Sequence, residues 1–233
     1  MTFDTIMNQL KSLGTEQNRN IYRNHGCDID MYGVSVANLK QVLKPIKRNQ
    51  ELGKQFFLSS NADAIYLSQW MVDPHQLTTE EVESRVLLSH YYMLIETAIP
   101  MILAKDKELS EQYLHRWLSH SESRFRQAAY SLFSLLVSIY PNEELDLAWI
   151  ERLLWNILEV IHEEDNRVRY TMNQFIISVG AAIPSLYELA FRIAQQIGVV
   201  EVSMGNTACK VPYAPDYLNK IKSMNRIGQK RKR

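Results

Sequence analysis

The sequence predicts an all-α protein built from stacked pairs of helices. Apolar residues recur at three- and four-residue spacing through most of the chain, which is the pattern of helices that each bury one face. A segment near the middle of the chain also repeats in register 43 residues later. The predicted helical stretches, separated by short polar breaks such as SHSES and PNEE, are 34–44, 86–104, 107–119, 122–139, 147–161, 167–182 and 184–197.

The first of these stretches, 34–44, leads into a basic cluster. Lys40, Lys44, Lys47 and Arg48 are spaced i, i+4, i+7 and i+8, so a helix would place them along one face. Pro45 would interrupt or kink that helix, because proline lacks a backbone donor and its ring clashes with the preceding turn. The cluster is a candidate surface for an anionic partner.

The second stretch, 86–104, is apolar but contains Glu96, with Tyr92, Ile95 and Ile99 close by in the sequence. A carboxylate in such surroundings must be paired, protonated or facing a cleft. Its i, i+4 spacing puts Tyr92 on the same helix face. The stretch is too short to span a bilayer once Glu96 interrupts it, so we expect no contact with a membrane.

The repeat aligns HSESRFRQAAYSLFSLLV, from residue 120, with EEDNRVRYTMNQFIISVG, from residue 163. Arg124 and Arg126 then match Arg167 and Arg169. A period of 43 residues lies in the range of HEAT or armadillo helix pairs, which bury their apolar faces only by stacking on their neighbours. We therefore predict a HEAT-like or armadillo-type helical-repeat solenoid whose inner helices form a concave surface.

The arginines of the second copy require an anionic partner. Arg167 and Arg169 fall at the start of the predicted helix 167–182, where a cation opposes the helix dipole at a cost of about 0.3–1 kcal/mol. The partner is either the adjoining acidic run 163–165 or an anion from another molecule. Both interpretations stay open from the sequence.

One stretch departs from the helical pattern. VEVSM and TACKV flank Gly205 and Asn206, which can take positive φ, so the pattern is compatible with a small β-hairpin near 200–211. No linker rich in Pro, Gly or Ser divides the chain. We expect a single domain, 1–233, with a flexible basic tail at 223–233.

The formal net charge is zero, but the charge is unevenly spread. Residues 143–165 hold eight acids against one base, whereas residues 204–233 hold eight bases against one acid. The terminal KRKR is either a solvated end or a phosphate-binding tail. A polyanionic partner is therefore compatible with a net charge of zero.

Composition and cysteine usage indicate an ordinary intracellular globular protein. The chain of 233 residues is 46% hydrophobic and 22% charged, and it begins without the pattern of a signal peptide. Cys27 and Cys209 are far apart and outside any CxxC, which fits a reducing compartment, so we expect a cytoplasmic protein. The six histidines are scattered without ligand spacing. We predict no metal and no cofactor, and expect a monomer.

Several longer motifs resemble a known family. NRVRYTMNQFIISVG at 166–180, MGNTACKVPYAPDYLNK at 204–220, the following IGQKRKR, and YYMLIETAIP at 91–100 are similar to segments of a bacterial branch of the DNA alkylation repair, AlkD-like, HEAT-repeat proteins. The resemblance implies a solenoid with a positively charged concave face that holds duplex DNA by its backbone. It also implies kinship with glycosylases that remove N3- or N7-alkylated purines.

The resemblance suggests residues for both activities. It aligns Tyr92 and Phe175 with two tryptophans of those glycosylases, the second within one residue, and Glu96 with their aspartate. All three keep their chemical class but change identity, which favours a DNA-binding protein over a monofunctional alkylpurine glycosylase. A protein-binding scaffold is a further alternative. The candidate DNA-binding residues are Lys40, Lys44, Lys47, Arg48, Arg124, Arg126, Arg167, Arg169, Asn173, Lys210 and Lys220.

Overall fold

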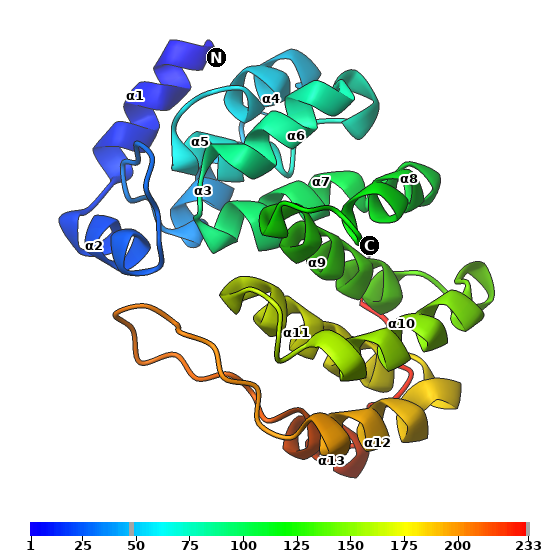
Figure 1. Ribbon diagram of the computed structural model, residues 1–233. Helices are drawn as coiled ribbons and strands as arrows, with labels where there is room; N and C mark the ends of the chain where they lie inside the picture. Colours follow the sequence, from blue (N-terminus) through cyan, green and yellow to red (C-terminus); the bar gives the residue numbers. More distant parts are fainter. Residues whose placement is uncertain (47–48, 232–233) are drawn as a thin grey trace. The chain divides into compact units, whose positions relative to one another are not determined.

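The structure, a computed structural model, describes residues 1–46 and 49–231. Lys47 and Arg48 of the predicted basic cluster lie outside the described residues. The described chain is helical and contains no sheet (Figure 1). Its contacts group it into two compact units, which we call unit 1 (Met1–Asp106 with Gly205–Thr207) and unit 2 (Lys107–Met204 with Ala208–Arg233). Their organisation as one domain stays a prediction.

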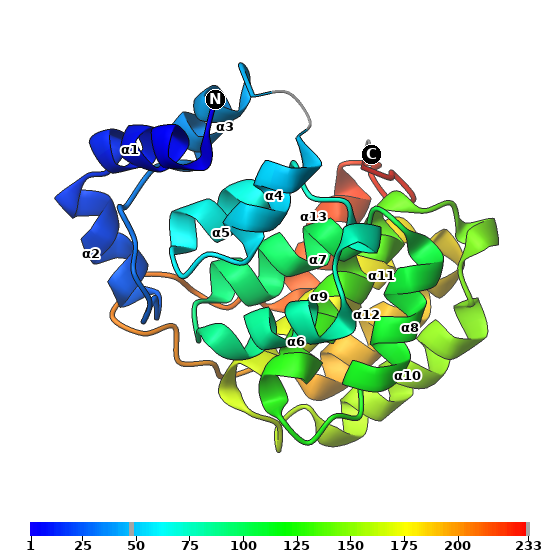
Figure 2. The ribbon, with the colours of Figure 1, turned by 90° about the horizontal axis from the view of Figure 1, so that it is seen from above.

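Unit 1 consists of short helices whose first turns are capped by side chains. The helices are α1 (Phe3–Leu13), α2 (Glu16–Asn24), α3 (Val36–Leu43), α4 (Gln50–Phe57), α5 (Ala62–Ser68), α6 (Thr79–Leu88) and α7 (Ile99–Leu103), with a π-helical segment, η2, at Met93–Ala98. A Ser, Thr or Asn accepts a hydrogen bond from the first turn in each of α1 to α6, which satisfies a donor that has no partner within the helix. Helices α4 and α5 pack together in this unit (Figure 2).

A buried carboxylate in α5 holds the loop that precedes α3. Asp63 is 2% exposed and accepts hydrogen bonds from the backbone N–H groups of Tyr32, Gly33 and Val34, at 2.6, 3.0 and 2.8 Å. Burial raises the pKa of Asp63, and the three backbone donors oppose that shift. Gly33 has a φ of +77°, and an added Cβ would come within 2.7 Å of the backbone of Thr15. The loop shape therefore requires glycine at this position.

The predicted helix at 34–44 is confirmed as α3, which ends at Leu43, before Pro45. The predicted stretch 86–104 is not one helix, because α6 ends at Leu88 and Ser89 is extended. The carboxylate of Asp28 accepts hydrogen bonds from the Ser89 hydroxyl and from the His90 backbone N–H, and it thereby holds this break.

Unit 2 contains the longer helices. These are α8 (Lys107–Trp117), α9 (Ser123–Ile139), α10 (Leu147–Val160), α11 (Asn166–Ala182), α12 (Tyr187–Ile197) and α13 (Ala214–Ser223). Helix α11 packs between α9 and α13, which forms a row of three helices, while α8 packs on α9 and α12 packs on α11 (Figure 1). Fully buried rings, among them Tyr130 and Phe175, fill the space between α9 and α11.

The 43-residue repeat is confirmed at the level of individual helix positions. Helices α9 and α11 are both 17 residues long, and they start at Ser123 and Asn166, 43 residues apart. Arg124 and Arg167 are each the second residue of their helix. The two helices are therefore equivalent elements of successive repeats, as stacked HEAT-like pairs require.

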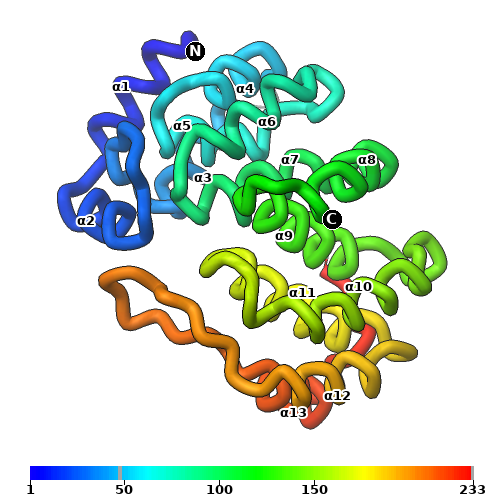
Figure 3. The backbone as a smooth tube through the Cα atoms, viewed as in Figure 1, coloured from blue at the N-terminus to red at the C-terminus, as the bar shows by residue number. Residues whose placement is uncertain are grey.

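The expected hairpin near 200–211 is absent. The segment between α12 and α13 is a long loop without strands (Figure 3). Both of its arms are tied to side chains of α11. Asn166 donates to the carbonyl of Ser203 and accepts from its N–H, at 2.8 and 2.7 Å, and Asn173 donates to the carbonyl of Pro212 at 2.9 Å. Tertiary hydrogen bonds to a helix thus replace the cross-strand pairing that the local pattern favoured.

The basic tail contacts unit 2 as far as Arg231, and its flexibility stays a prediction. It donates hydrogen bonds to carbonyls in the last turns of α9 and α11, where carbonyls lack a partner within their own helix. The bonds run from Gly228 N–H to Ala181, from Lys230 Nζ to Val137 and from Arg231 N–H to Ser138, at 2.8, 2.7 and 2.8 Å. Desolvation lowers the pKa of the Lys230 ammonium. A cation at the C-terminal end of a helix also favours the helix dipole.

Candidate functional site

The first turn of α11 holds two of the predicted cationic residues. Asp165 occupies the N-cap position, but its side chain makes no capping hydrogen bond. The Arg167 guanidinium lies over the Tyr170 ring at 4.3 Å and donates to the sulfur of Met204 at 3.5 Å. These contacts hold Arg167 against neighbouring side chains of unit 2 and leave it half-buried.

Arg169 has different surroundings, although it is only half a turn away from Arg167. Its side chain is half-buried, and its buried Nε has no hydrogen-bond partner. Across the described parts of the chain, Arg169 also forms no ion pair with an acidic side chain. A buried donor without an acceptor costs about 1–3 kcal/mol. An external anion would remove that cost if the side chain moved so that the anion accepted a hydrogen bond from Nε.

Arg126, at the equivalent position of α9, is fully engaged with the protein. Its Nη2 lies 2.7 Å from a carboxylate oxygen of Glu164, and its Nε donates to the same carboxylate. Its Nη1 donates to the carbonyls of His120 and Ser121, at 2.6 and 3.0 Å. The hydrogen bond with Glu164 raises the pKa of Arg126. Glu164 precedes the helix of the next repeat, so the ion pair joins two successive repeats.

The remaining predicted DNA-binding residues that the structure describes fall into an exposed group and a group engaged within unit 2. Lys40 and Lys44 are exposed in unit 1, where Lys40 lies over the Trp70 ring at 5.8 Å. Lys210 and Lys220 are exposed in unit 2. The last two residues are engaged within unit 2: Arg124 pairs with Glu122 at 2.9 Å, and Asn173 is 2% exposed and holds the Pro212 carbonyl.

The predicted catalytic residues Tyr92 and Glu96 share one side of the η2 region in unit 1. The half-buried residues there are 92, 93, 96 and 97, and the others from 91 to 100 are buried. The Tyr92 ring contacts the His25 ring edge-on, with centroids 5.3 Å apart. A π-helical segment inside a longer helix is frequently found at functional sites. Tyr92 and Glu96 are therefore partly exposed on the same side, and their catalytic role stays a prediction.

Phe175, the third predicted catalytic residue, lies in unit 2 and is 0% exposed. Its ring packs against Phe133 at 5.1 Å and Tyr130 at 6.0 Å between centroids. This is the position of a core residue, and the ring cannot touch a nucleotide in this conformation. An aromatic residue at helical spacing is usually part of the core.

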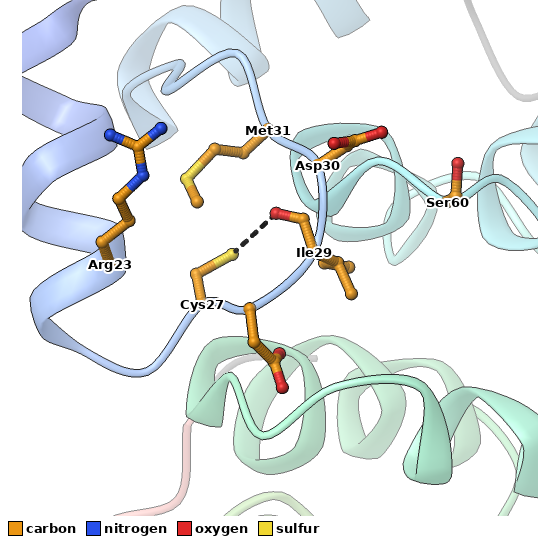
Figure 4. Close-up of a pocket in the computed structure, with 7 residues that line it drawn as sticks. Arg23, Cys27, Ile29, Asp30, Met31 and Ser60 are labelled. Carbon is orange, nitrogen blue, oxygen red and sulfur yellow. Dashed lines mark hydrogen bonds between the residues drawn. The ribbon is translucent and has the colours of Figure 1, made fainter.

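A cavity of about 590 Å³ lies in unit 1, and none of the predicted site residues lines it. Its walls combine charged, polar and apolar groups, including Arg23, Asp30, Met31 and Ser60 (Figure 4). Cys27 also lines it, with its thiol directed at the Ile29 carbonyl at 3.8 Å. Burial raises the pKa of Cys27 to about 11, so the thiol stays protonated at neutral pH.

Among the described residues, no group of three or more His, Cys, Asp or Glu side chains is arranged to hold a metal ion. No single described helix is long and apolar enough to cross a membrane, although the bent pair Asn166–Ala182 and Pro184–Ile197 is so in combined length and composition.

Comparison with known proteins shows which family the sequence matches. The sequence profile of the family described as DNA alkylation repair enzyme matches residues 6–197. Uncharacterised proteins from Listeria monocytogenes and Listeria innocua are each 30% identical over 228 residues, which is 96% of this chain and 98% of theirs.

A solved structure is also similar over almost its whole length. It is described as a new family of proteins related to the HEAT-like repeat DNA glycosylases with affinity for branched DNA structures. It has a TM-score of 0.90 and 26% sequence identity, and the match covers 99% of this chain and 98% of that chain. The HEAT-like repeat fold predicted from the 43-residue period is thereby confirmed.

Proposed function

The chain belongs to the DNA alkylation repair enzyme family, and from this premise we propose that it binds DNA, with a preference for branched DNA, through phosphate contacts. The observation that carries the proposal is the Arg169 guanidinium, which lacks a hydrogen-bond partner at its buried Nε in the first turn of α11. The structural relative with affinity for branched DNA supports the choice of ligand.

A phosphate near the start of α11 would resolve two unfavourable features. The free backbone N–H groups and the positive end of the helix dipole attract an anion at a helix N-terminus. Arg167 and Arg169 oppose the dipole when no anion is present, at about 0.3–1 kcal/mol per charge. A bound phosphate would offset that repulsion and would accept from the Arg169 guanidinium.

Exposed cations elsewhere would supply additional phosphate contacts. In unit 2 these are Lys210 and Lys220, and in unit 1 they are Lys40 and Lys44. Lys47 and Arg48 remain part of the proposal on their sequence positions alone. Arg126 does not belong to this set, because Glu164 and two carbonyls already occupy its donors.

An alkylpurine glycosylase is the second candidate function. Tyr92 and Glu96 favour it, because a carboxylate stabilises the positive charge that develops on the sugar and an aromatic ring can hold a cationic base. The burial of Phe175 weighs against it, since the second aromatic partner is then part of the core. The binding function therefore accounts for more of the site than the glycosylase does.

The test compares binding and base release with the same preparation of full-length protein. Fluorescence anisotropy with a linear duplex, a three-way junction and a four-way junction of equal nucleotide number measures affinity, and a duplex with 7-methylguanine measures base release. We expect tighter binding to the junctions and no more base release than from Glu96→Gln. Base release by the wild type alone would establish the enzyme instead. No binding to any probe at low salt would contradict the proposal and leave the protein-binding scaffold.

A further inference from the structure

Helix α13 and its N-cap together expose two tyrosines and a lysine. Tyr213 is 42% exposed at its N-cap, and Tyr217, 50% exposed, follows one turn later. Lys220 is exposed in the last turn. Tyr217 and Lys220, at i and i+3, share one helix face, and Tyr213 stands at the N-cap of the same helix, where its backbone is extended.

The opposite side of α13 makes the contacts that hold the helix in unit 2. Leu218 is 0% exposed and packs where α11 has Gly180, whose added Cβ would lie 2.7 Å from the leucine side chain. Lys222 lies over the Tyr187 ring at 4.6 Å and pairs with Glu188 at 3.1 Å. The side with the tyrosines is therefore not the packing side of α13.

The tyrosine side chains have no ring contact and no side-chain hydrogen bond in the described parts of the chain. Exposed large aromatic side chains that lie together commonly mark a surface that another molecule covers. The charge of the segment indicates the chemical class of the partner. Residues 204–233 hold eight basic residues and one acidic residue, Asp216. An anionic partner with flat apolar faces fits both features.

We propose that this side of α13 binds unpaired nucleotides of DNA, whose bases stack on Tyr213 and Tyr217 while Lys220 contacts an adjoining phosphate. Every base has a π face, so stacking on aromatic side chains tolerates any sequence, and basic residues follow the backbone. Paired bases inside a duplex present only their edges to a protein, which excludes them from this surface. The proposal rests on the DNA-binding function and names the structural element that unpaired nucleotides would recognise.

The experiment uses two three-way junctions that differ only in two unpaired nucleotides at the branch, one of them 2-aminopurine, and an intact linear duplex. Anisotropy gives the Kd and 2-aminopurine fluorescence reports stacking. We expect Tyr217→Ala to weaken binding to the junction with unpaired nucleotides about tenfold and to abolish the fluorescence change. Binding to the linear duplex should stay within about twofold, and Tyr217→Phe should keep both readouts because it keeps the ring.

A second pair of variants tests the charge. Lys220→Ala should weaken binding to the same junction, whereas Asp216→Asn should strengthen it by removing a repulsive carboxylate one turn from Lys220. An unchanged Kd and fluorescence change in Tyr217→Ala, with junction binding by the wild type intact, would overturn the stacking proposal alone. Equal losses on the junction and on the duplex would overturn it as well. A wild-type protein that binds none of the DNA probes would instead overturn the proposed function itself.

Discussion

The first turns of α9 and α11 carry arginines at the same helix positions, yet the two arginines have opposite surroundings. Arg126 is held by Glu164 and two carbonyls, whereas the buried Nε of Arg169 has no acceptor. Glu164 lies 38 residues beyond Arg126, and the residue at the same separation beyond Arg169 is Thr207, which carries no charge. The arginine position that pairs with an acid of the next repeat in α9 thus has no acid at the same separation in α11.

The largest expected effect is on stability, and it comes from α9. Arg126→Ala leaves Glu164, whose side chain is 15% exposed, without its cationic partner, and we expect a loss of about 3 kcal/mol. This corresponds to a fall in Tm of roughly 6–12 °C for a chain of this size. Thermal and chemical unfolding measure it, with Arg152→Ala, an exposed cation of α10, as the matched control. A loss of stability no larger than that of the control would show that the Arg126–Glu164 ion pair does not stabilise the fold.

The second prediction concerns the partner position in α11. Arg169→Ala should change the unfolding free energy by less than about 1 kcal/mol, because no ion pair is lost and a buried donor without an acceptor is removed. Its Kd for DNA should rise about tenfold, which is the size of one charge-assisted hydrogen bond. Melting temperature and anisotropy are measured on the same sample.

Arg169→Lys is the matched control for this position. It keeps the charge but loses the planar fork, so it should fall between the wild type and Arg169→Ala in affinity. A fall in stability as large as that of Arg126→Ala, with the affinity of the folded protein intact, would place Arg169 in the scaffold. The contrast between the two helices would then disappear.

Salt dependence sharpens the same comparison. The logarithm of the DNA association constant should fall linearly with the logarithm of salt concentration, and each lost phosphate contact should flatten the slope by about 0.9. We expect that change for Arg169→Ala, and also for Lys210→Ala and Lys220→Ala. Arg126→Ala should leave the slope as it is, because its donors are occupied by the protein. Unchanged slopes in the lysine variants would remove those residues from the interface.

The repeat register could be read from the sequence because it depends on local periodicity. The 43-residue offset placed Arg124 over Arg167 correctly, and α3 ended before Pro45 as expected. The acidic run 163–165 was one possible partner for the arginines of α11. In the structure, Glu164 of that run pairs instead with Arg126 of the preceding repeat. Sequence spacing alone does not tell which repeat an acid faces.

The features that sequence analysis missed depend on contacts between distant segments. The pattern at 200–211 favoured a hairpin, but its backbone groups are bound by Asn166 and Asn173 of α11. The tyrosines of α13 were read only as part of a family motif, although their i, i+4 spacing beside Lys220 was visible in the sequence. Exposure is what distinguishes that spacing from a packed helix face, and exposure is a property of the fold.

The smallest expected effect comes from the first residue of each helix, where the two repeats also differ. Asn166 in α11 makes two hydrogen bonds with the backbone of Ser203, whereas Ser123 in α9 makes no side-chain hydrogen bond with any described residue. Asn166→Ala should therefore cost about 1 kcal/mol and free the Ser203 amide, whose hydrogen exchange should become about fivefold faster. Ser123→Ala, the matched control, should leave that exchange rate unchanged. Equal rates in both variants would mean that the loop after α12 keeps its conformation without Asn166, and that the first turn of α11 differs from that of α9 only in its arginines.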